Sequence, residues 1–283
     1  MSLVGSPKLS NETFTQLRDL IYSKTGILFS VNKLYLLENR LKWRLEYSGC
    51  VNYEEYLYLL KYDPRRTQEY QSLFNSVTTN ETFFFRDAIQ TKAFYEDILP
   101  SVVMENEKAG RRELKLWSAA SSTGEEAYTL AMQVLRRGLK AKGWKISVSA
   151  SDINSKVLAT ARQGKYGPYS IKHVPPDYME KYFNNSAEAY QVLPEVKNLV
   201  SFSNMNLIDG AAMRGMRDFD VIFCRNVLIY FDHEAKKKVI ESLYDSLRPG
   251  GYLFIGYSES LHNISRAFKL KHFNKALVYQ KEL

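Results

Sequence analysis

The residues best suited to chemistry are two adjacent glutamates, Glu125 and Glu126, within the stretch Leu114–Met132. An apolar run of strand character precedes them, small residues end at Gly124, and a helical apolar pattern follows. A strand, a small-residue turn and a helix N-terminus form the first unit of a doubly wound α/β sheet, where nucleotide-like ligands bind. The turn lacks the G-x-G-x-x-G fingerprint, and two carboxylates repel a pyrophosphate. They suit a ligand with an ammonium group and no phosphate, such as S-adenosylmethionine.

A second acidic candidate follows the next predicted strand, Ile146–Ser151. Asp152 stands at the carboxyl end of this strand, and Asn154 comes shortly after it. A carboxylate at this place can accept hydrogen bonds from both ribose hydroxyls of a nucleoside. Either side chain could instead cap the predicted helix Ser155–Gln163, so both roles are open for both residues.

A third candidate region is Thr78–Asp87, TTNETFFFRD, in which three consecutive phenylalanines occur. Asn80, Thr82 and Arg86 flank the aromatic run and place polar groups beside an apolar wall, a composition typical of ligand pockets. An aromatic run between helices is equally typical of a linker that is buried against both neighbours. The residues alone leave both interpretations open.

The N-terminal part of the chain predicts helices only, and therefore a helical recognition domain. Its basic residues Lys33, Arg40 and Arg44 lie beside a leucine stripe, either as a solvated flank or as a basic ridge for an acidic helical partner. The predicted helices are one capped by Ser10 and closed by Gly26, one with Leu34, Leu37, Leu41 and Leu45 that ends at Gly49, and the segments Tyr53–Lys61 and Arg66–Val77.

The remainder of the chain alternates strands and helices. Asp87 is expected to cap a helix that runs to Leu99, before Pro100, and residues 169–198 interrupt the alternation as an inserted small β subdomain. The pattern of five strands with crossover helices followed by an antiparallel pair is that of the S-adenosylmethionine-dependent methyltransferases. The later strands are predicted at 199–203, 219–225 and 252–257, the last of them after a tight turn at 248–251, with a hairpin of 268–272 and 277–281 joined at Asn274-Lys275.

The amino-acid composition bears on three classes of function: metal binding, membrane insertion and nucleic-acid binding. The four histidines and two cysteines show no metal-ligand spacing, so we expect no metal, and Cys224 is predicted to be a buried thiol in a strand. No apolar run is long enough for a bilayer, and residues 1–10 lack a signal-peptide core, which predicts a cytoplasmic protein without membrane insertion. The net charge of +8 is compatible with an acidic partner, which could be nucleic acid, a membrane surface or an acidic protein, but the charge alone fits a soluble protein that happens to be basic better. No block of like charges forms a nucleic-acid tail, so we expect no nucleic acid.

Six motifs in register resemble the chemotaxis receptor glutamate O-methyltransferases of the CheR type. In chain order they are TTNETFFFRD, WSAASSTGEEAYTLAM, SDIN, ARQGKY, FDVIFCRNVLIYF and LRPGGYLFIGYSESL. The resemblance covers nearly the whole chain. It implies a Rossmann-like class I methyltransferase sheet of the α/β class, with an antiparallel C-terminal hairpin and an inserted three-stranded β subdomain. It also implies a helical receptor-recognition domain and linker at residues 1–85, and a methyltransferase domain at 86–283.

The same resemblance implies which residues meet S-adenosylmethionine. Glu126 would bind its amino-acid end, with Glu125 as the alternative, and Asp152 would bind the ribose hydroxyls. Arg86 and Tyr230 would lie nearest the transferred methyl group, as the catalytic residues. The implied cofactor-binding set is Asn80, Thr82, Arg86, Glu126, Asp152, Asn206 and Leu207 beside the adenine, and Arg225 and Asn226, which close the pocket.

The implied reaction moves a methyl group from S-adenosylmethionine to receptor glutamates and leaves S-adenosylhomocysteine. A glutamate carboxylate, with an ordinary pKa near ~4.3, is already ionised at neutral pH, which agrees with the lack of a candidate histidine base. The expected partner is the acidic helical cytoplasmic region of a methyl-accepting chemotaxis receptor, which favours the basic-ridge interpretation. We expect a monomer recruited to receptor arrays. Gln191 and Leu193 stand where relatives often carry arginine, which leaves recognition of a receptor tail peptide open.

Three other functions compete with this one. An amine methyltransferase commonly shows [DNS]-P-P-Y after the fourth strand, where this chain has RNVLIYF. A dinucleotide oxidoreductase requires the missing glycine fingerprint. A catalytically weak, cofactor-sensing docking module of a chemosensory array is the third alternative, and intact Arg86, Glu126, Asp152 and Tyr230 argue against it.

Overall fold

A computed structural model describes residues 7–185, 189–273 and 275–282. The chain forms two compact units. The first comprises Met1–Thr79 together with Tyr230–Asp232, and the second comprises Asn80–Ile229 and His233–Leu283. Among the described residues, no helix combines the length and the apolar character that crossing a membrane requires.

The first unit consists of helices, as its sequence predicts. Ser10 caps the first helix by accepting a hydrogen bond from the Thr13 N–H, and Gly26 ends it in the left-handed conformation. The leucine stripe of the second helix is buried at Leu37, Leu41 and Leu45. The helices are α1 (Asn11–Thr25), η1 (Val31–Lys33), α2 (Leu34–Ser48), α3 (Tyr53–Tyr62) and α4 (Arg66–Val77).

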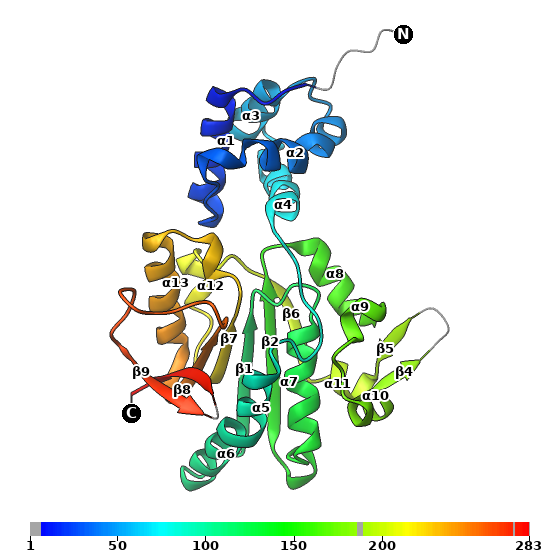
Figure 1. The fold of residues 1–283 in the computed structure, drawn as a ribbon, viewed down its shortest axis with the longest axis vertical. Helices are drawn as coiled ribbons and strands as arrows, with labels where there is room; N and C mark the ends of the chain where they lie inside the picture. Colours follow the sequence, from blue (N-terminus) through cyan, green and yellow to red (C-terminus); the bar gives the residue numbers. More distant parts are fainter. Residues whose placement is uncertain (1–6, 186–188, 274, 283) are drawn as a thin grey trace. The chain divides into compact units, whose positions relative to one another are not determined.

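The second unit is built on a seven-stranded sheet with the order β6-β2-β1-β7-β8-β10-β9 (Figure 1). The first five strands in this order are parallel, and β10 pairs antiparallel with both β8 and β9. The sheet therefore has the expected Rossmann-like methyltransferase form with an antiparallel C-terminal pair. Its strands are β1 (Glu113–Ala119), β2 (Lys145–Asp152), β6 (Val200–Asn204), β7 (Phe219–Cys224), β8 (Leu247–Ile255), β9 (Phe268–Phe273) and β10 (Ala276–Lys281).

The strand β7, FDVIFC, is an almost continuous apolar run, as expected of a central parallel strand with both faces covered. Every residue of β7 is buried, including Cys224, the thiol expected to be buried there. The helix α7 contributes Ala127, Leu130 and Ala131 to the same core. The connecting helices are α7 (Glu125–Arg136), η3 (Lys140–Lys142), α8 (Ser155–Gln163), α12 (Gly210–Met213), η4 (Leu228–Tyr230) and α13 (His233–Ser246).

The inserted subdomain contains a three-stranded sheet in the order β3-β5-β4. Its first strand lies ahead of residue 169, where the insertion was expected to begin, because the chain pairs again immediately after Gly164 ends α8. The strands are β3 (Lys165–Tyr166), β4 (Phe183–Asn185) and β5 (Tyr190–Val192), accompanied by α9 (Pro168–Ile171), α10 (Pro176–Tyr182) and α11 (Pro194–Lys197).

The helix that Asp87 caps was predicted to end at Leu99, and this prediction was wrong. The helix runs through α5 (Ala88–Ala93), a π-helical turn η2 (Phe94–Ile98) and α6 (Leu99–Lys108). The wider turn restarts the hydrogen-bond ladder, so Pro100 falls in the first turn of α6, where its missing N–H has no cost. A proline pattern in the sequence cannot distinguish a stop from such a restart.

The segment Arg248–Gly251 is also not a separate tight turn. The strand β8 already begins at Leu247, and the pairing register with β7 shifts between Phe219 and Val221. Gly250 has a φ of +78°, so the strand passes this point as an irregularity, not as a loop. The predicted hairpin is confirmed in β9 and β10, and Asn274 of its turn lies outside the described residues.

Gly124 allows α7 to start close against the neighbouring elements. Its φ is +93°, and a Cβ atom there would lie 2.9 Å from the Cβ of Ala161 and 3.0 Å from the ring of Phe202. Gly138 has a similar φ of +69°, but its surroundings are open. Substituting alanine at Gly138 therefore measures the backbone strain alone, and the same change at Gly124 adds the effect of crowding.

We predict that Gly124→Ala lowers the free energy of unfolding by about 3 kcal/mol, from left-handed backbone strain plus overpacking. Gly138→Ala should lower it by only about 1 kcal/mol, from the backbone alone. Chemical denaturation followed by circular dichroism measures both values. An equal decrease in the free energy of unfolding in both variants would show that the contact with Ala161 does not contribute.

Candidate functional site

The turn between β1 and α7 holds an unusual backbone. Ala120, Ser122 and Gly124 have φ values of +62°, +50° and +93°. Such left-handed conformations are costly for residues other than glycine and concentrate at ligand sites. The Ser121 hydroxyl in this turn is buried and has no hydrogen-bond partner within the described ranges. Strain and a spare polar group together fit a turn that is shaped around a ligand.

Asp152 is the last residue of β2 and lies next to this turn. Its carboxylate accepts hydrogen bonds from the backbone N–H groups of Ser122 and Asn154, both at 2.8 Å. Burial raises the pKa of this carboxyl, although the backbone donors oppose the shift. Asn154 caps α8 by accepting from the Lys156 and Val157 N–H groups, so the capping role that the sequence left open belongs to Asn154.

The two glutamates at the start of α7 have different surroundings. Glu125 is 1% exposed, and its carboxylate accepts hydrogen bonds from the hydroxyls of Thr123 (2.6 Å) and Ser170 (2.9 Å). Burial raises the pKa of Glu125, and the two hydroxyl donors partly offset this effect. Glu125 therefore joins the turn to the segment around Ser170 inside the fold.

Glu126 points to the carboxyl ends of the strands instead. One of its oxygens accepts from the Ser118 hydroxyl at 2.7 Å, and the other accepts from the Arg225 guanidinium at 3.1 Å. A carboxylate can accept about four hydrogen bonds, so these two leave room for an ammonium group. Of the pair, Glu126 is the one in a position to bind a cationic ligand.

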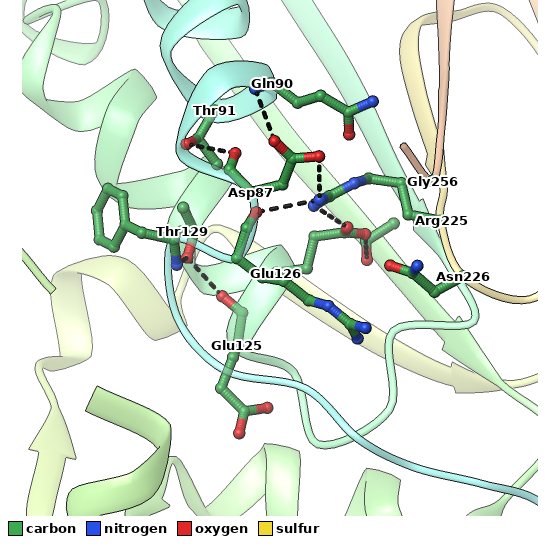
Figure 2. A network of polar contacts seen from close by, with 12 residues as sticks. Asp87, Gln90, Thr91, Glu125, Glu126, Thr129, Arg225, Asn226 and Gly256 are labelled. Carbon is green, nitrogen blue, oxygen red and sulfur yellow. Dashed lines mark hydrogen bonds and ion pairs between the residues drawn. The ribbon is translucent and has the colours of Figure 1, made fainter. Parts of the chain in front are cut away.

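Arg225 follows β7 and is only 8% exposed. Figure 2 shows its guanidinium between two carboxylates, with Glu126 at 3.1 Å and Asp87 at 3.5 Å. It also donates to the backbone carbonyl of Arg86 at 3.1 Å. These three contacts join α7, the end of β7 and the segment that precedes α5.

That segment is held against α7 by its backbone. Phe85 has a φ of +55° and donates its N–H to the Thr129 hydroxyl at 3.2 Å, and the Phe84 ring packs against Tyr166 and Phe183. Phe84 and Phe85 are thus buried within the second unit, and the burial against both neighbours that one interpretation required stays a prediction. The Arg86 side chain is half-buried beside it, and its Nη1 donates to the Glu81 carbonyl.

Other predicted residues reach the same edge of the sheet through neighbouring contacts. The Asn80 carbonyl accepts from the Ser122 hydroxyl at 3.3 Å. The Asp152 carbonyl accepts from the Asn204 amide (3.0 Å) and the Met205 N–H (2.9 Å), which brings the loop with Asn206 and the buried Leu207 next to β2. Asn226 follows Arg225 directly. Thr82 is half-buried in the segment before α5.

The remaining predicted residues belong to the helical unit. Tyr230 lies there, and its carbonyl accepts from the Leu28 N–H at 3.0 Å. Its role beside the transferred methyl group stays a prediction.

The basic ridge is largely engaged inside its own unit. Arg44 pairs with Glu69 at 2.7 Å, and Arg40 donates to the Val77 carbonyl and the Thr79 hydroxyl. Lys33 is exposed. Two of the three ridge residues therefore have structural partners, and Lys33 presents its charge to solvent.

Sequence reasoning missed several residues that build the site. Asp87 was expected only to cap a helix, yet its carboxylate also faces Arg225. Ser118 and Ser122 were treated only as small residues, yet they bind the two candidate carboxylates. The one signal for them in the sequence is their place in the small-residue turn after a buried strand.

A cavity of about 660 Å³, whose lining includes Asp87, lies between the segment before α5, α7 and the region around α10. It is lined by Tyr95, Gln133, Arg136 and Tyr178 among others, and it includes none of the predicted site residues. Within the part of the chain that the structure describes, no three histidine, cysteine or acidic side chains gather as metal ligands would.

Comparison with known proteins gives matches over nearly the whole chain. Residues 80–277 match the family model described as "CheR methyltransferase, SAM binding domain", and residues 12–78 match "CheR methyltransferase, all-alpha domain". Chemotaxis protein methyltransferase 2 of Vibrio cholerae is 35% identical and covers 96% of this chain and 94% of its own. The chemotaxis protein methyltransferase of Escherichia coli is also 35% identical, over 93% of this chain and 89% of its own.

We predict a pH dependence that distinguishes Glu125. Because burial raises its pKa in the folded state, the protonated form stabilises the fold below the ordinary carboxyl pKa, and this contribution is lost as the pH rises through the raised value. The stability of Glu125→Gln relative to the native chain should therefore be higher at pH 8 than at pH 4. Thermal unfolding at both pH values measures the difference. A variant that loses equal stability at both would contradict the assignment.

Proposed function

Because the chain belongs to the CheR methyltransferase family, we propose that it is a protein-glutamate O-methyltransferase of bacterial chemoreceptors. It transfers methyl groups from S-adenosylmethionine to glutamate side chains and yields glutamyl methyl esters and S-adenosylhomocysteine. The observation that carries the proposal is the pair of carboxylates, Glu126 of α7, which accepts from Ser118 of β1, and Asp152 at the carboxyl end of the neighbouring strand β2. This donor set suits a ligand with an ammonium group and a ribose.

The residues that would hold S-adenosylmethionine follow from their chemistry. Glu126 would accept from its ammonium group, and Asp152, fixed by two backbone donors, would accept from its ribose hydroxyls. Asn206 and Leu207 would flank the adenine. The strained turn after β1 and its spare Ser121 hydroxyl support a ligand at this place. Asn80, Thr82, Arg86, Arg225 and Asn226 would complete the set.

When bound, S-adenosylmethionine supplies a methyl group on a positively charged sulfur, which a carboxylate can attack directly. The receptor carboxylate needs no general base, because it is ionised at neutral pH. The chain must then align this carboxylate and exclude water. Arg86 would hold it through one guanidinium N–H, since a two-bond fork would weaken the nucleophile, and Tyr230 would orient it.

The position of Arg86 supports this role. Its backbone carbonyl is held by the buried Arg225, and its guanidinium lies 5.7 Å from the Phe83 ring. The main chain is thus fixed while the long side chain is half-buried. The guanidinium donates to the Glu81 carbonyl through Nη1, which leaves its other N–H groups to meet an incoming anion.

We further propose that residues 1–85 recognise the receptor and that residues 86–283 carry the transfer. The partner would be the acidic helical cytoplasmic region of a chemoreceptor, with the enzyme acting as a cytoplasmic monomer at receptor arrays. Exposed Lys33 is the ridge residue best placed to contact it, and Arg40 and Arg44 would contribute less. The alternative of a catalytically weak docking module is not favoured.

The test is transfer of radiolabelled methyl groups to receptor-containing membranes. The label should be released by mild alkali, because methyl esters hydrolyse and methylated amines do not. Titration with S-adenosylhomocysteine measures binding separately. A base-stable label, or binding without any transfer, would contradict the proposal.

We predict that Arg86→Ala lowers turnover about 100-fold, because it removes a charged group that positions the reacting carboxylate. The affinity for S-adenosylhomocysteine should fall far less. Arg162→Ala is the matched control, since Arg162 is exposed and donates to the Phe202 carbonyl. A variant that loses cofactor affinity and keeps its turnover would contradict the role.

We predict that Lys33→Glu raises the receptor KM by about three- to fivefold, as expected for one exposed charge, and leaves cofactor affinity unchanged. Lys8→Glu makes the same charge change off the ridge and should have no effect. Arg44→Glu should instead lower the stability of the helical unit, since it places two carboxylates together at Glu69. Unchanged receptor kinetics in Lys33→Glu would remove this residue from the interface.

A further inference from the structure

Glu259, in the last of the six sequence motifs, binds two neighbouring loops together. Its carboxylate accepts backbone N–H groups from Asn226 (3.0 Å), Ile229 (3.2 Å) and Gly256 (2.5 Å). Asn226 and Ile229 follow β7, and Gly256 follows β8, which pairs with β7 in parallel. One side chain thus satisfies three main-chain donors where two adjacent strands end.

The backbone around this carboxylate is closely packed. Asn226 has a φ of +58°, so its left-handed conformation needs support from its surroundings. A Cβ atom on Gly256 would lie 2.7 Å from the Glu259 carboxylate and 3.0 Å from the Asn226 nitrogen. A methyl group here would push the carboxylate aside, so glycine lets the Gly256 N–H approach it closely. Hydrogen bonds from backbone N–H groups to a charged carboxylate oxygen are stronger than those between neutral groups.

We propose that Glu259 is a positioning residue for methyl transfer. It fixes the backbone of Asn226, and so sets the direction in which Asn226 and the adjoining Arg225 project. Arg225 in turn holds the Glu126 carboxylate and the Arg86 carbonyl. This inference rests on the proposed function, since it assigns Glu259 to the support of that same site. Glu259 is not required to touch either substrate.

The variant Glu259→Gln tests this role with little change in shape. One terminal oxygen can still accept from Asn226 and Gly256, but an amide nitrogen then faces the Ile229 N–H. We expect the dissociation constant of S-adenosylhomocysteine to rise about tenfold, as for one lost charged hydrogen bond. We expect kcat to fall by a similar factor, with the receptor KM unchanged. Amide hydrogen exchange at Asn226 and Ile229 should become faster.

A second variant approaches the same contact from the other side. Gly256→Ala pushes a methyl group against the Glu259 carboxylate and should weaken cofactor binding to a similar degree. The effects of the two changes should not add in the double variant, because both disturb one contact. Glu107→Gln, on the exposed surface of α6, is the control and should match the native chain.

Two results would overturn the inference. One is faster exchange at these amides with unchanged cofactor affinity and kcat, which would make the contact structural only. The other is full additivity of Glu259→Gln and Gly256→Ala. Failure of the proposed function is distinguishable, because the native chain would then give no base-labile methyl label, while the cofactor affinities and exchange rates would still report on Glu259.

Discussion

The geometry at the strand ends depends on one buried cation, the Arg225 guanidinium. A cation removed from water is costly unless anions and hydrogen-bond acceptors surround it. Glu126 from α7, Asp87 from the cap of α5 and the carbonyl of Arg86 meet this requirement at the two terminal nitrogens, whereas the buried Nε has no hydrogen-bond partner among the described residues. Removing one carboxylate would leave the cation with a single anionic partner, and removing both would leave an uncompensated buried charge. Three segments that are distant in the sequence are therefore held in one arrangement.

The candidate acceptors are thus held in place by the fold itself, through backbone donors and through side chains. Asp152 is oriented by two N–H groups, and the turn beside it keeps three left-handed residues. Glu126 is oriented by Ser118 and Arg225. A preorganised set of acceptors loses little conformational freedom on binding, which is how a site gains affinity without additional contacts. The strained conformation of the turn is offset by the stability of the surrounding structure.

Local periodicity was sufficient to predict most elements, because helix and strand patterns are read from neighbouring residues. The limits of α8 and the cap of α1 follow from the sequence for this reason. The different roles of Glu125 and Glu126 do not follow, because their partners Ser170 and Arg225 lie 45 and 99 residues away. The prediction that the helix ends before Pro100 was wrong for a different reason: the π-helical turn Phe94–Ile98 lies ahead of the proline, and the residue pattern used to predict the helix gives no sign of it.

The burial of Cys224 has a practical consequence. Thiols react as thiolates, and burial, with the Glu259 and Glu126 charges nearby, raises the pKa of Cys224 well above its ordinary value. Cys50 is free and half-buried in the helical unit. A maleimide dye will therefore attach to Cys50 first. The native chain accepts one fluorophore without engineering, and its anisotropy can report how the helical unit tumbles when a large partner binds.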